Sequence, residues 1–448
     1  MMTGMTWAEQ ELGDASLGDA RLSRRLVKLA TRLAESPSSS IPQACRGWAE
    51  MRAAYRFLAK DKVDWQDMLQ PHWDASLQRM REHPVVLCLQ DTTELDFEGK
   101  ATRGLGPLSY EAQRGMYLHP TYAVTPGRVP LGVIDAWMWA REFKDKDGNR
   151  PGLCESVRWI EGYERVAEQA RQMPDTRLVY VADREGDIVE LMRRARDLGH
   201  PADWLIRSKH DRSLGKGAGK LSAALQDAPV VGTIEFDMAA RQGVQARRVR
   251  QQLRVLRTEL PDDKSGKVEV SVVLASEIDA PAGVKPVQWR LLTNRRVETP
   301  EQSVELIDWY RARWEIEILF HTLKNGCRIE QLQLDSFDKL ERAIALYLVV
   351  SWRIGYLMRL SRDEHACERP ASEFFCPLEC RLAYALHRKK PPARPKLKEV
   401  VRLVAMLGGF IGRKGDGEPG VKTLWQGMHD LRRAVQAAEI LREAGSLD

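Results

Sequence analysis

The sequence predicts an α/β fold in which a mixed sheet is flanked by helices, with a helical domain at each end of the chain. Three observations predict it: helical spacing dominates before Pro84, buried strands then alternate with helices to about residue 210, and helical spacing returns after residue 300. The 448 residues are too many for one ordinary domain. We therefore predict three domains: a helical domain at 1–75, an α/β domain at 76–365 and a helical domain at 366–448.

The first domain is predicted to contain helices with a basic face. Asp19 can cap the first of them, after which leucines recur at helical spacing: Leu22, Leu26, Leu29 and Leu33. A second helix has an apolar side formed by Trp48, Met51, Tyr55 and Leu58. A solvated surface and a phosphate-binding surface both fit two consecutive basic helices. The candidate phosphate contacts are Arg21, Arg25 and Lys28.

In the α/β domain, two buried strands each end in an aspartate. "VVLCLQD" is an apolar run that ends in Asp91, and "TRLVYVADREGD" contains a second run that ends in Asp183. Further strands are predicted around the "PGRVP" turn and in "ADWLIRSKH". The two aspartates are therefore expected to leave the core at the edge of the sheet.

Residues 212–300 interrupt this alternation of strands and helices. They contain four β-rich segments: "VVGTIEFDM", "RRVRQQLRVLR", "KVEVSVVLASEI" and "PVQWRLLTN". We interpret them as an inserted antiparallel subdomain.

Charge is distributed unevenly along the chain. The net charge is only +6, but residues 17–62 contain ten Lys or Arg against four acids, and residues 387–433 contain twelve against four. Such clusters indicate a polyanionic partner.

The start of the chain shows no secretory signal, and the apolar stretch "AIALYLVV" is far too short to span a bilayer. The seven cysteines are interpreted as reduced thiols, so we expect a cytoplasmic protein without membrane contact.

The segment "YRARWEIEILFHTLK" gathers an acid among bases. On one continuous helix, Tyr310, Glu317 and Lys324 align at spacings of seven residues, with Arg313 and His321 beside that line and Glu315 turned away. Alone, Asp91, Asp183 or Glu317 could cap a turn or lie in solvent. Together their carboxylates suit two Mg²⁺ ions, with Mn²⁺ as a substitute, because these ions prefer oxygen ligands. Two such metals can activate an attacking oxygen and stabilise a leaving oxygen in phosphodiester chemistry.

Three motifs connect the sequence with a known family. "DTTELDF" at Asp91, "DREGDI" at Asp183 and the Y-x2-R-x3-E-x6-K pattern at 310–324 resemble the motifs of DDE transposases. More narrowly, they are similar to the Tn-five-type transposases of the IS-four insertion-sequence family. The resemblance covers nearly the whole chain and implies an RNase H-like sheet with a β-rich insertion between the second and third acids. The gaps agree, at 183 − 91 = 92 and 317 − 183 = 134 residues.

The resemblance also implies roles for individual residues. It makes Asp91, Asp183 and Glu317 the catalytic, metal-binding triad. It implies that phosphates of the transposon end are contacted by Tyr310, Arg313 and Lys324, with His321 in place of a family lysine. Basic positions near the active site correspond to Arg207, Lys209 and Arg212. Trp289 matches a position that stacks on a base extruded from DNA, although Trp314 and a core role for Trp289 remain alternatives.

The function implied is that of a cut-and-paste DNA transposase. It would bind inverted ends of double-stranded DNA, pair them as a homodimer, cleave through a hairpin and join the ends to target DNA. The alternatives are a DNA-binding inhibitor and a non-transposing nuclease of the same fold. The expected location is a bacterial cytoplasm, on the nucleoid when bound to DNA.

An apolar seam in the C-terminal helix fits either packing within the chain or dimerisation; it comprises Leu424, Met428, Leu431, Val435 and Ala438.

Overall fold

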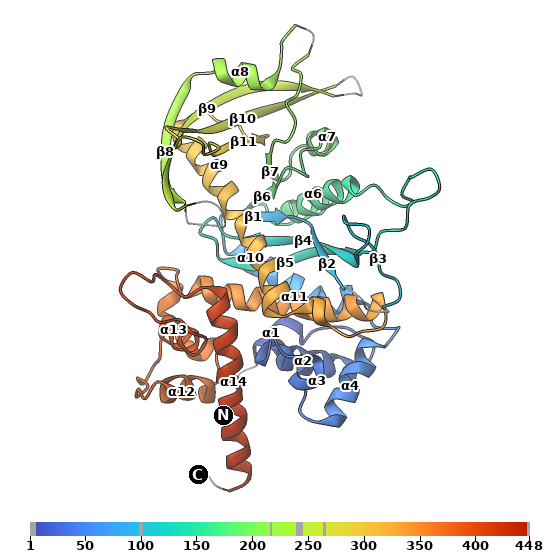
Figure 1. Ribbon diagram of the computed structural model, residues 1–448, viewed down its shortest axis with the longest axis vertical. Coiled ribbons are helices and arrows are strands. Elements are labelled where there is room, and N and C mark those ends of the chain that lie inside the picture. The colour runs from blue at the N-terminus through green and yellow to red at the C-terminus, as the bar shows by residue number, and fades with distance from the viewer. Residues whose placement is uncertain (1–5, 98–101, 216, 239–244, 263–265, 446–448) are drawn as a thin grey trace.

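The computed structural model describes residues 6–97, 102–215, 217–238, 245–262 and 266–445. Figure 1 shows an elongated molecule with a sheet above and helices below. Its strands are β1 (Val85–Gln90), β2 (Thr93–Asp96), β3 (Gly106–Pro107), β4 (Arg114–Val124), β5 (Pro130–Trp139), β6 (Arg177–Ala182), β7 (Asp203–Arg207), β8 (Val230–Met238), β9 (Arg247–Pro261), β10 (Lys267–Ile278) and β11 (Gln288–Thr293).

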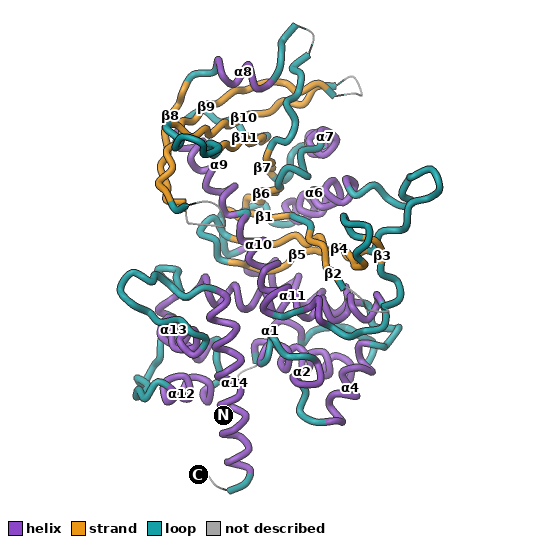
Figure 2. Tube along the Cα trace, viewed as in Figure 1, coloured by secondary structure: helices purple, strands orange, loops and turns teal. Residues whose placement is uncertain are grey.

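The helices of the first half are α1 (Trp7–Leu12), α2 (Ala20–Glu35), α3 (Ile41–Ala44), α4 (Trp48–Leu58), α5 (Trp65–Arg81), α6 (Ser156–Arg171), α7 (Val189–Asp197) and α8 (Leu221–Asp227). Those of the second half are α9 (Pro300–Ala312), α10 (Trp314–His321), α11 (Phe337–Leu360), α12 (Pro377–Leu386), α13 (Leu397–Leu407) and α14 (Val421–Glu443). A π-helical turn covers Thr322–Gly326, and short 3₁₀ turns cover Ile329–Gln331, Ala366–Glu368 and Ala371–Glu373. Helices dominate the lower half of the molecule and strands the upper half (Figure 2).

The N-terminal helices bury the leucine stripe. Leu26, Leu29 and Leu33 are fully buried, and Asp19 caps α2 by accepting a hydrogen bond from the backbone N–H of Arg21. One detail of the expectation is wrong: Trp48 is 69% exposed, because it is the first residue of α4 and lies outside the packed turns. Helix α5 extends across residue 75, where we predicted a domain boundary.

All strands belong to one sheet, with the order β2-β4-β1-β6-β7-β11-β10-β9-β8, while β3 and β5 also pair with β4. Strands β1, β6 and β7 are parallel neighbours. The inserted strands are antiparallel, as expected, yet they extend the central sheet, because β11 pairs with the otherwise open edge of β7. The insertion therefore shares the backbone ladder of the central sheet (Figure 1).

The sheet is covered on both faces. Leu87 and Leu89 of β1 belong to a core that includes α11, whereas Val86 and Cys88 belong to a second core with α6 and α7. Burial on both faces explains the uninterrupted apolar run of this strand. Helix α11 is long and apolar enough to cross a membrane, but 89% of its most apolar window is buried inside the protein, as expected of a core helix.

The apolar seam of the C-terminal helix packs within the chain, which is one of its two expected uses. Leu424, Leu431 and Val435 are buried within the chain, where α14 packs on α13, α12 and α11. The seam is therefore used mainly inside the protomer. The end of α14 projects below the body in Figure 1, and there Ile440 is 64% and Leu441 46% exposed.

Candidate active site

Sheet topology brings the two strand-end aspartates together. Strands β1 and β6 are parallel neighbours with Gln90 opposite Ala182, so Asp91 and Asp183 follow directly at the same edge. Backbone N–H groups orient both carboxylates. Thr92 donates to Asp91 over 2.8 Å, and Glu185 donates to Asp183 over 2.7 Å.

Arg313 connects the third acid, Glu317, to this edge. Its Nη1 lies 2.5 Å from Oδ2 of Asp91, and its Nη2 lies 3.2 Å from Oε1 of Glu317. Arg313 stands between α9 and α10, so the segment that we predicted as one continuous helix is interrupted at this residue. The guanidinium thus bridges two of the three predicted metal ligands.

This cluster contains more negative than positive charge, which disfavours the ionised form of Asp91. Burial raises the pKa of Asp91 to about 7; Arg313 opposes this shift, and the charges of Asp183 and Glu317 add to it. Burial by itself would lower the pKa of Arg313, but the neighbouring Asp91, Tyr310 and Glu317 raise it. One arginine therefore interacts with three carboxylates whose charges repel one another.

The donor set fits a hard divalent cation, because all three side chains offer carboxylate oxygens. Within the described ranges, no three His, Cys, Asp or Glu side chains already form a group that could hold a metal. At the acidic edge, the bridging position is taken by Arg313, so a metal and this arginine would compete for Asp91 and Glu317.

A buried polar network supports the edge from below. The Tyr180 hydroxyl donates to Gln90 Oε1 over 2.5 Å, and Gln90 Nε2 donates to Thr121 Oγ1 over 3.2 Å. Beside it, Thr92 Oγ1 lies 2.7 Å from His119 Nδ1, and burial lowers the pKa of His119 to about 3, so that the ring is neutral. Sequence reasoning missed these residues. The one available signal was Gln90, a polar residue inside an apolar strand.

The second aspartate of the "DREGD" motif organises the basic segment after β7. Asp187 Oδ2 accepts from the backbone N–H groups of Lys209 and His210 over 2.6 and 3.0 Å. Its Oδ1 pairs with Arg212 at 2.5 Å, and the Asp187 side chain is fully buried. Arg212 is thus engaged by the protein itself.

Two predicted bases line a cationic cavity of about 340 Å³. Arg207 and Lys209 share its wall with Arg184 and Arg290, which sequence reasoning missed, and with no acidic side chain among the described lining residues. Arg184 directly follows Asp183 in the sequence, so the cavity lies beside the acidic edge. It is therefore suited to a phosphate.

A larger cleft of about 1560 Å³ collects most of the remaining predicted residues. Its lining includes Arg207, Trp289, Tyr310, Arg313 and Trp314. Trp289 is half-buried and stacks on Phe236, with ring centroids 5.5 Å apart and an interplanar angle of 16°. Trp314 is 61% exposed, whereas Tyr310 is largely buried.

Lys324 and His321 do not line this cleft. The π-helical turn after α10 adds backbone per turn and breaks the seven-residue alignment with Glu317. Lys324 Nζ lies 3.8 Å from Glu330, and the His321 ring lies 5.4 Å from the ring of Trp425. The alignment predicted for an ideal helix therefore ends at His321.

The basic residues of α2 differ in their surroundings. The Arg21 side chain is 84% exposed and lies 3.4 Å from Asp19, while Lys28 pairs with Glu50 at 3.0 Å. Arg25 has no ion pair among the residues that the structure describes. Arg21 and Arg25 are therefore available to a ligand, whereas Lys28 is neutralised by Glu50.

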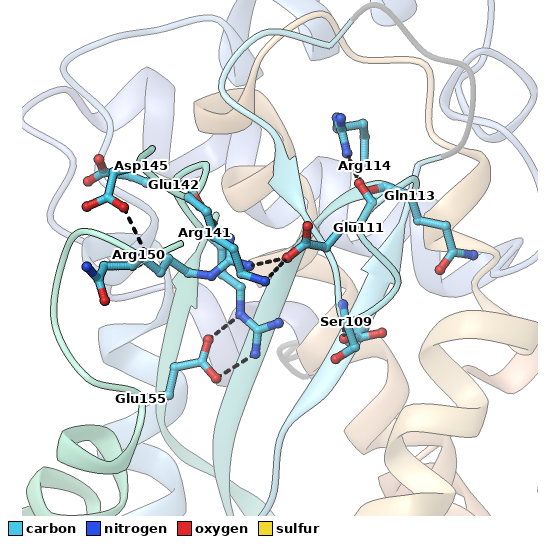
Figure 3. A network of polar contacts seen from close by, with 12 residues as sticks. Ser109, Glu111, Gln113, Arg114, Arg141, Glu142, Asp145, Arg150 and Glu155 are labelled. Atoms are coloured by element: carbon cyan, nitrogen blue, oxygen red, sulfur yellow. Dashed lines mark hydrogen bonds and ion pairs between the residues drawn. The ribbon is translucent and has the colours of Figure 1, made fainter. Parts of the chain in front are cut away.

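Figure 3 shows a charged network that joins the loop after β5 to the segment between β3 and β4. Arg141 forms a bidentate pair with Glu155 and stacks over the Tyr117 ring at 4.1 Å. On the same loop, Arg150 lies 3.2 Å from Glu111. The charges of Glu155 and Arg141 also act on Glu185, two residues after Asp183. The network therefore lies close to the acidic edge.

Comparisons with known proteins indicate the family of the chain. Three family models match successive parts of the chain: "Transposase DNA-binding" at residues 4–63, "Transposase DDE domain" at 155–352 and "Transposase Tn5 dimerisation domain" at 349–446. A solved structure, a piggyBac transposase synaptic complex with hairpin DNA, aligns with 96% of this chain and 76% of that chain. That alignment has 8% identity and a TM-score of 0.42. The three family models, in the order of their domains, identify the chain as a DDE transposase that resembles the Tn5 transposase.

Proposed function

We propose that this transposase moves DNA by a cut-and-paste route, with Asp91, Asp183 and Glu317 as its catalytic triad. It binds the inverted ends of its element, pairs them in a dimer, cleaves each end through a hairpin and joins the ends to target DNA. The observation that carries the proposal is the convergence of the three carboxylates beside a cleft lined with arginines and aromatic residues.

The acids supply the ligands for divalent ions, which DDE transposases use. Two Mg²⁺ ions, or Mn²⁺ in their place, would supply activation of the attacking oxygen and stabilisation of the leaving oxygen. Thr92 and Glu185 hold the aspartates in position through their backbone N–H groups. Arg313 keeps Asp91 and Glu317 together until DNA arrives, and then exchanges these carboxylates for a backbone phosphate.

Hairpin formation requires a sharply bent strand, and the aromatic residues of the cleft are suited to receive an unstacked base. Trp289 already stacks on Phe236, so one face of its ring is covered and the other side of the residue borders the cleft. An abasic position near the end should restore hairpin formation to Trp289→Ala. If Trp314→Ala shows this rescue instead, the more exposed tryptophan holds the base.

The paired cutting of two ends requires two active sites, and the Tn5-type dimerisation domain supplies a means of pairing. We assign the contact to the projecting end of α14, because Leu424 and Leu431 are already buried in the protomer. Ile440→Asp with Leu441→Asp should preserve folding and single-end binding but prevent paired-end complexes. The enzyme acts in the bacterial cytoplasm, on the nucleoid.

A metal-dependent assay on DNA that carries the matched inverted repeats tests the proposal. Nicked, hairpin and strand-transfer products are expected in sequence. Nicking without strand transfer would indicate a non-transposing nuclease. Binding without nicking in Mg²⁺ or Mn²⁺ would indicate a DNA-binding inhibitor.

A further inference from the structure

The loop between α12 and α13 carries charge that neither the active site nor the N-terminal helices explain. We call residues 387–395 the connector loop. Four of its bases are exposed: Arg388, Lys389, Lys390 and Arg394. None of the four forms an ion pair within the part of the chain that the structure describes.

Neighbouring bases show that acids are present in this region. Lys396 pairs with Glu368, and Lys398 lies 3.5 Å from Glu418. Arg402 also lies 3.5 Å from Glu418. The bases that border α13 are thus neutralised by the protein, while those at the tip of the connector loop are not.

The connector loop is also held in a defined shape. His387 Nε2 donates to the Leu403 carbonyl over 2.8 Å, and the backbone N–H of Lys389 donates to the Tyr384 carbonyl over 3.0 Å. At the other end, the Pro395 carbonyl accepts from the N–H of Ala371 over 2.8 Å. Two prolines between these anchors, Pro391 and Pro392, and Pro395 at the second anchor restrict the backbone further.

Like charges fixed close together repel one another, and a polyanion relieves that repulsion. The loop's one aromatic side chain, His387, is already bonded to the Leu403 carbonyl, and its exposed side chains are chiefly cations, which suit backbone phosphates. Its contacts would therefore be to phosphates, independent of sequence. Sequence-independent contacts suit the target duplex, because the proposed reaction must bind this DNA although it carries no terminal repeat.

We propose that the connector loop binds the phosphate backbone of target DNA. The inference rests on the proposed strand-transfer function. It adds a DNA contact on the dimerisation domain to those of the N-terminal helices and the cleft. Terminal DNA and an acidic protein are the rival occupants, and the experiment below separates them from target DNA.

The test variant combines Arg388→Gln, Lys389→Gln, Lys390→Gln and Arg394→Gln. The matched control combines Lys396→Gln and Lys398→Gln, which removes neighbouring bases that are already paired. Affinity is measured over a range of salt concentrations for complexes preassembled on terminal DNA and offered a duplex without the repeat. Four lost phosphate contacts should reduce the slope of log affinity against log salt by about 3 to 4.

Strand transfer should fall in the test variant, while terminal-DNA binding and nicking stay at the wild-type level. An unchanged slope for the target duplex would overturn the proposal and leave a protein partner as the alternative. A reduced slope for terminal DNA alone would assign the loop to that DNA and also overturn it. Should the fourfold variant lose its melting transition, Lys389→Gln with Lys390→Gln should still lower the target slope by about 2. A wild-type enzyme that fails to nick terminal DNA would instead contradict the proposed function.

Discussion

Asp91 and Asp187 are both shielded from solvent near the ends of neighbouring strands, and each faces an arginine, but their surroundings differ. Asp187 accepts two backbone N–H groups and pairs with Arg212. Asp91 accepts one backbone N–H group and shares Arg313 with Glu317. Other carboxylates act on Asp91, and burial raises its pKa to about 7.

We interpret this difference as one between a structural carboxylate, Asp187, and a functional one, Asp91. A buried carboxylate that is fully paired holds its segment in place. A buried carboxylate with too little positive charge around it favours the binding of a cation. The "DREGD" motif thus combines two roles: Asp183 contributes to the acidic edge, and Asp187 anchors the basic segment after β7. Four kinds of variant test this division, beginning with the largest expected effect.

The largest effect is expected on cleavage. Glu317→Gln and Asp91→Asn should each abolish nicking while terminal-DNA binding persists, because each removes a carboxylate that we propose as a metal ligand. A loss of several orders of magnitude is expected in a metal-dependent nicking assay, as transition-state stabilisation by a metal contributes several kcal/mol. Equal cleavage by the wild type and Glu317→Gln would remove Glu317 from the triad.

The control for this experiment has to be chosen from the structure. Glu315 turns away from the acidic edge, as its helical position indicates, but it is buried and pairs with Arg359, with Nε 2.8 Å from Oε2. Its substitution would disturb folding. Glu305 on α9 is exposed and pairs with Arg295 at 2.8 Å, so Glu305→Gln should cleave like the wild type.

The second effect is on stability. Asp187→Asn should lower the free energy of unfolding by about 3–5 kcal/mol, because it leaves the largely buried Arg212 without its partner. Asp91→Asn should change it by less than about 1 kcal/mol, since relief of a buried charge offsets the weaker pairing of Arg313, which keeps Glu317. Denaturant unfolding of both metal-free variants measures the difference. Equal losses would mean that Asp91 is as well compensated as Asp187.

The same contrast explains what the sequence could predict. An apolar run that ends in an aspartate is a local pattern, so Asp91 and Asp183 could be identified directly. The bridging position of Arg313 depends on how α9 and α10 dock on the sheet, and Asp187 requires the β7 segment to fold back onto it. Neither contact is local in sequence.

Helical spacing has a related limit in the C-terminal region. The spacing correctly indicates that Leu424 and Leu431 share one face of α14, but not which surface covers that face. Packing on α13 and α12 uses it within the protomer. Similarly, the alignment of Lys324 with Glu317 assumed a uniform helix, which the π-helical turn interrupts. The triad is a prediction that awaits the cleavage test.

The third effect concerns metal binding without DNA. If Arg313 competes for the carboxylates, Arg313→Ala should bind Mn²⁺ about tenfold more tightly than the wild type, which corresponds to about 1.4 kcal/mol. Isothermal titration with Mn²⁺ alone measures this affinity, and nicking should nevertheless decrease because a phosphate contact is lost. Arg311→Ala is the control, since Arg311 lies 3.5 Å from Asp308 and makes no ion pair with the three acids among the described residues. Unchanged or weaker Mn²⁺ binding in Arg313→Ala would show that the bridge does not restrict the site.

The smallest effect distinguishes the bases that are held by the protein from those that are open to DNA. Lys209 lines the cationic cavity, and its side chain is exposed, whereas Arg212 is engaged by Asp187. Lys209→Gln should therefore reduce the slope of log affinity against log salt by about 0.9, the contribution of one phosphate contact. Arg212→Gln should leave that slope unchanged and lower the melting temperature instead, because it leaves the Asp187 charge unpaired in the interior. Filter binding of terminal DNA over a range of salt concentrations, with thermal unfolding of the same samples, measures both quantities. If Arg212→Gln lowers the slope as much as Lys209→Gln does, Arg212 exchanges Asp187 for phosphate when DNA binds, and the division between a structural and a functional pair no longer holds at this position.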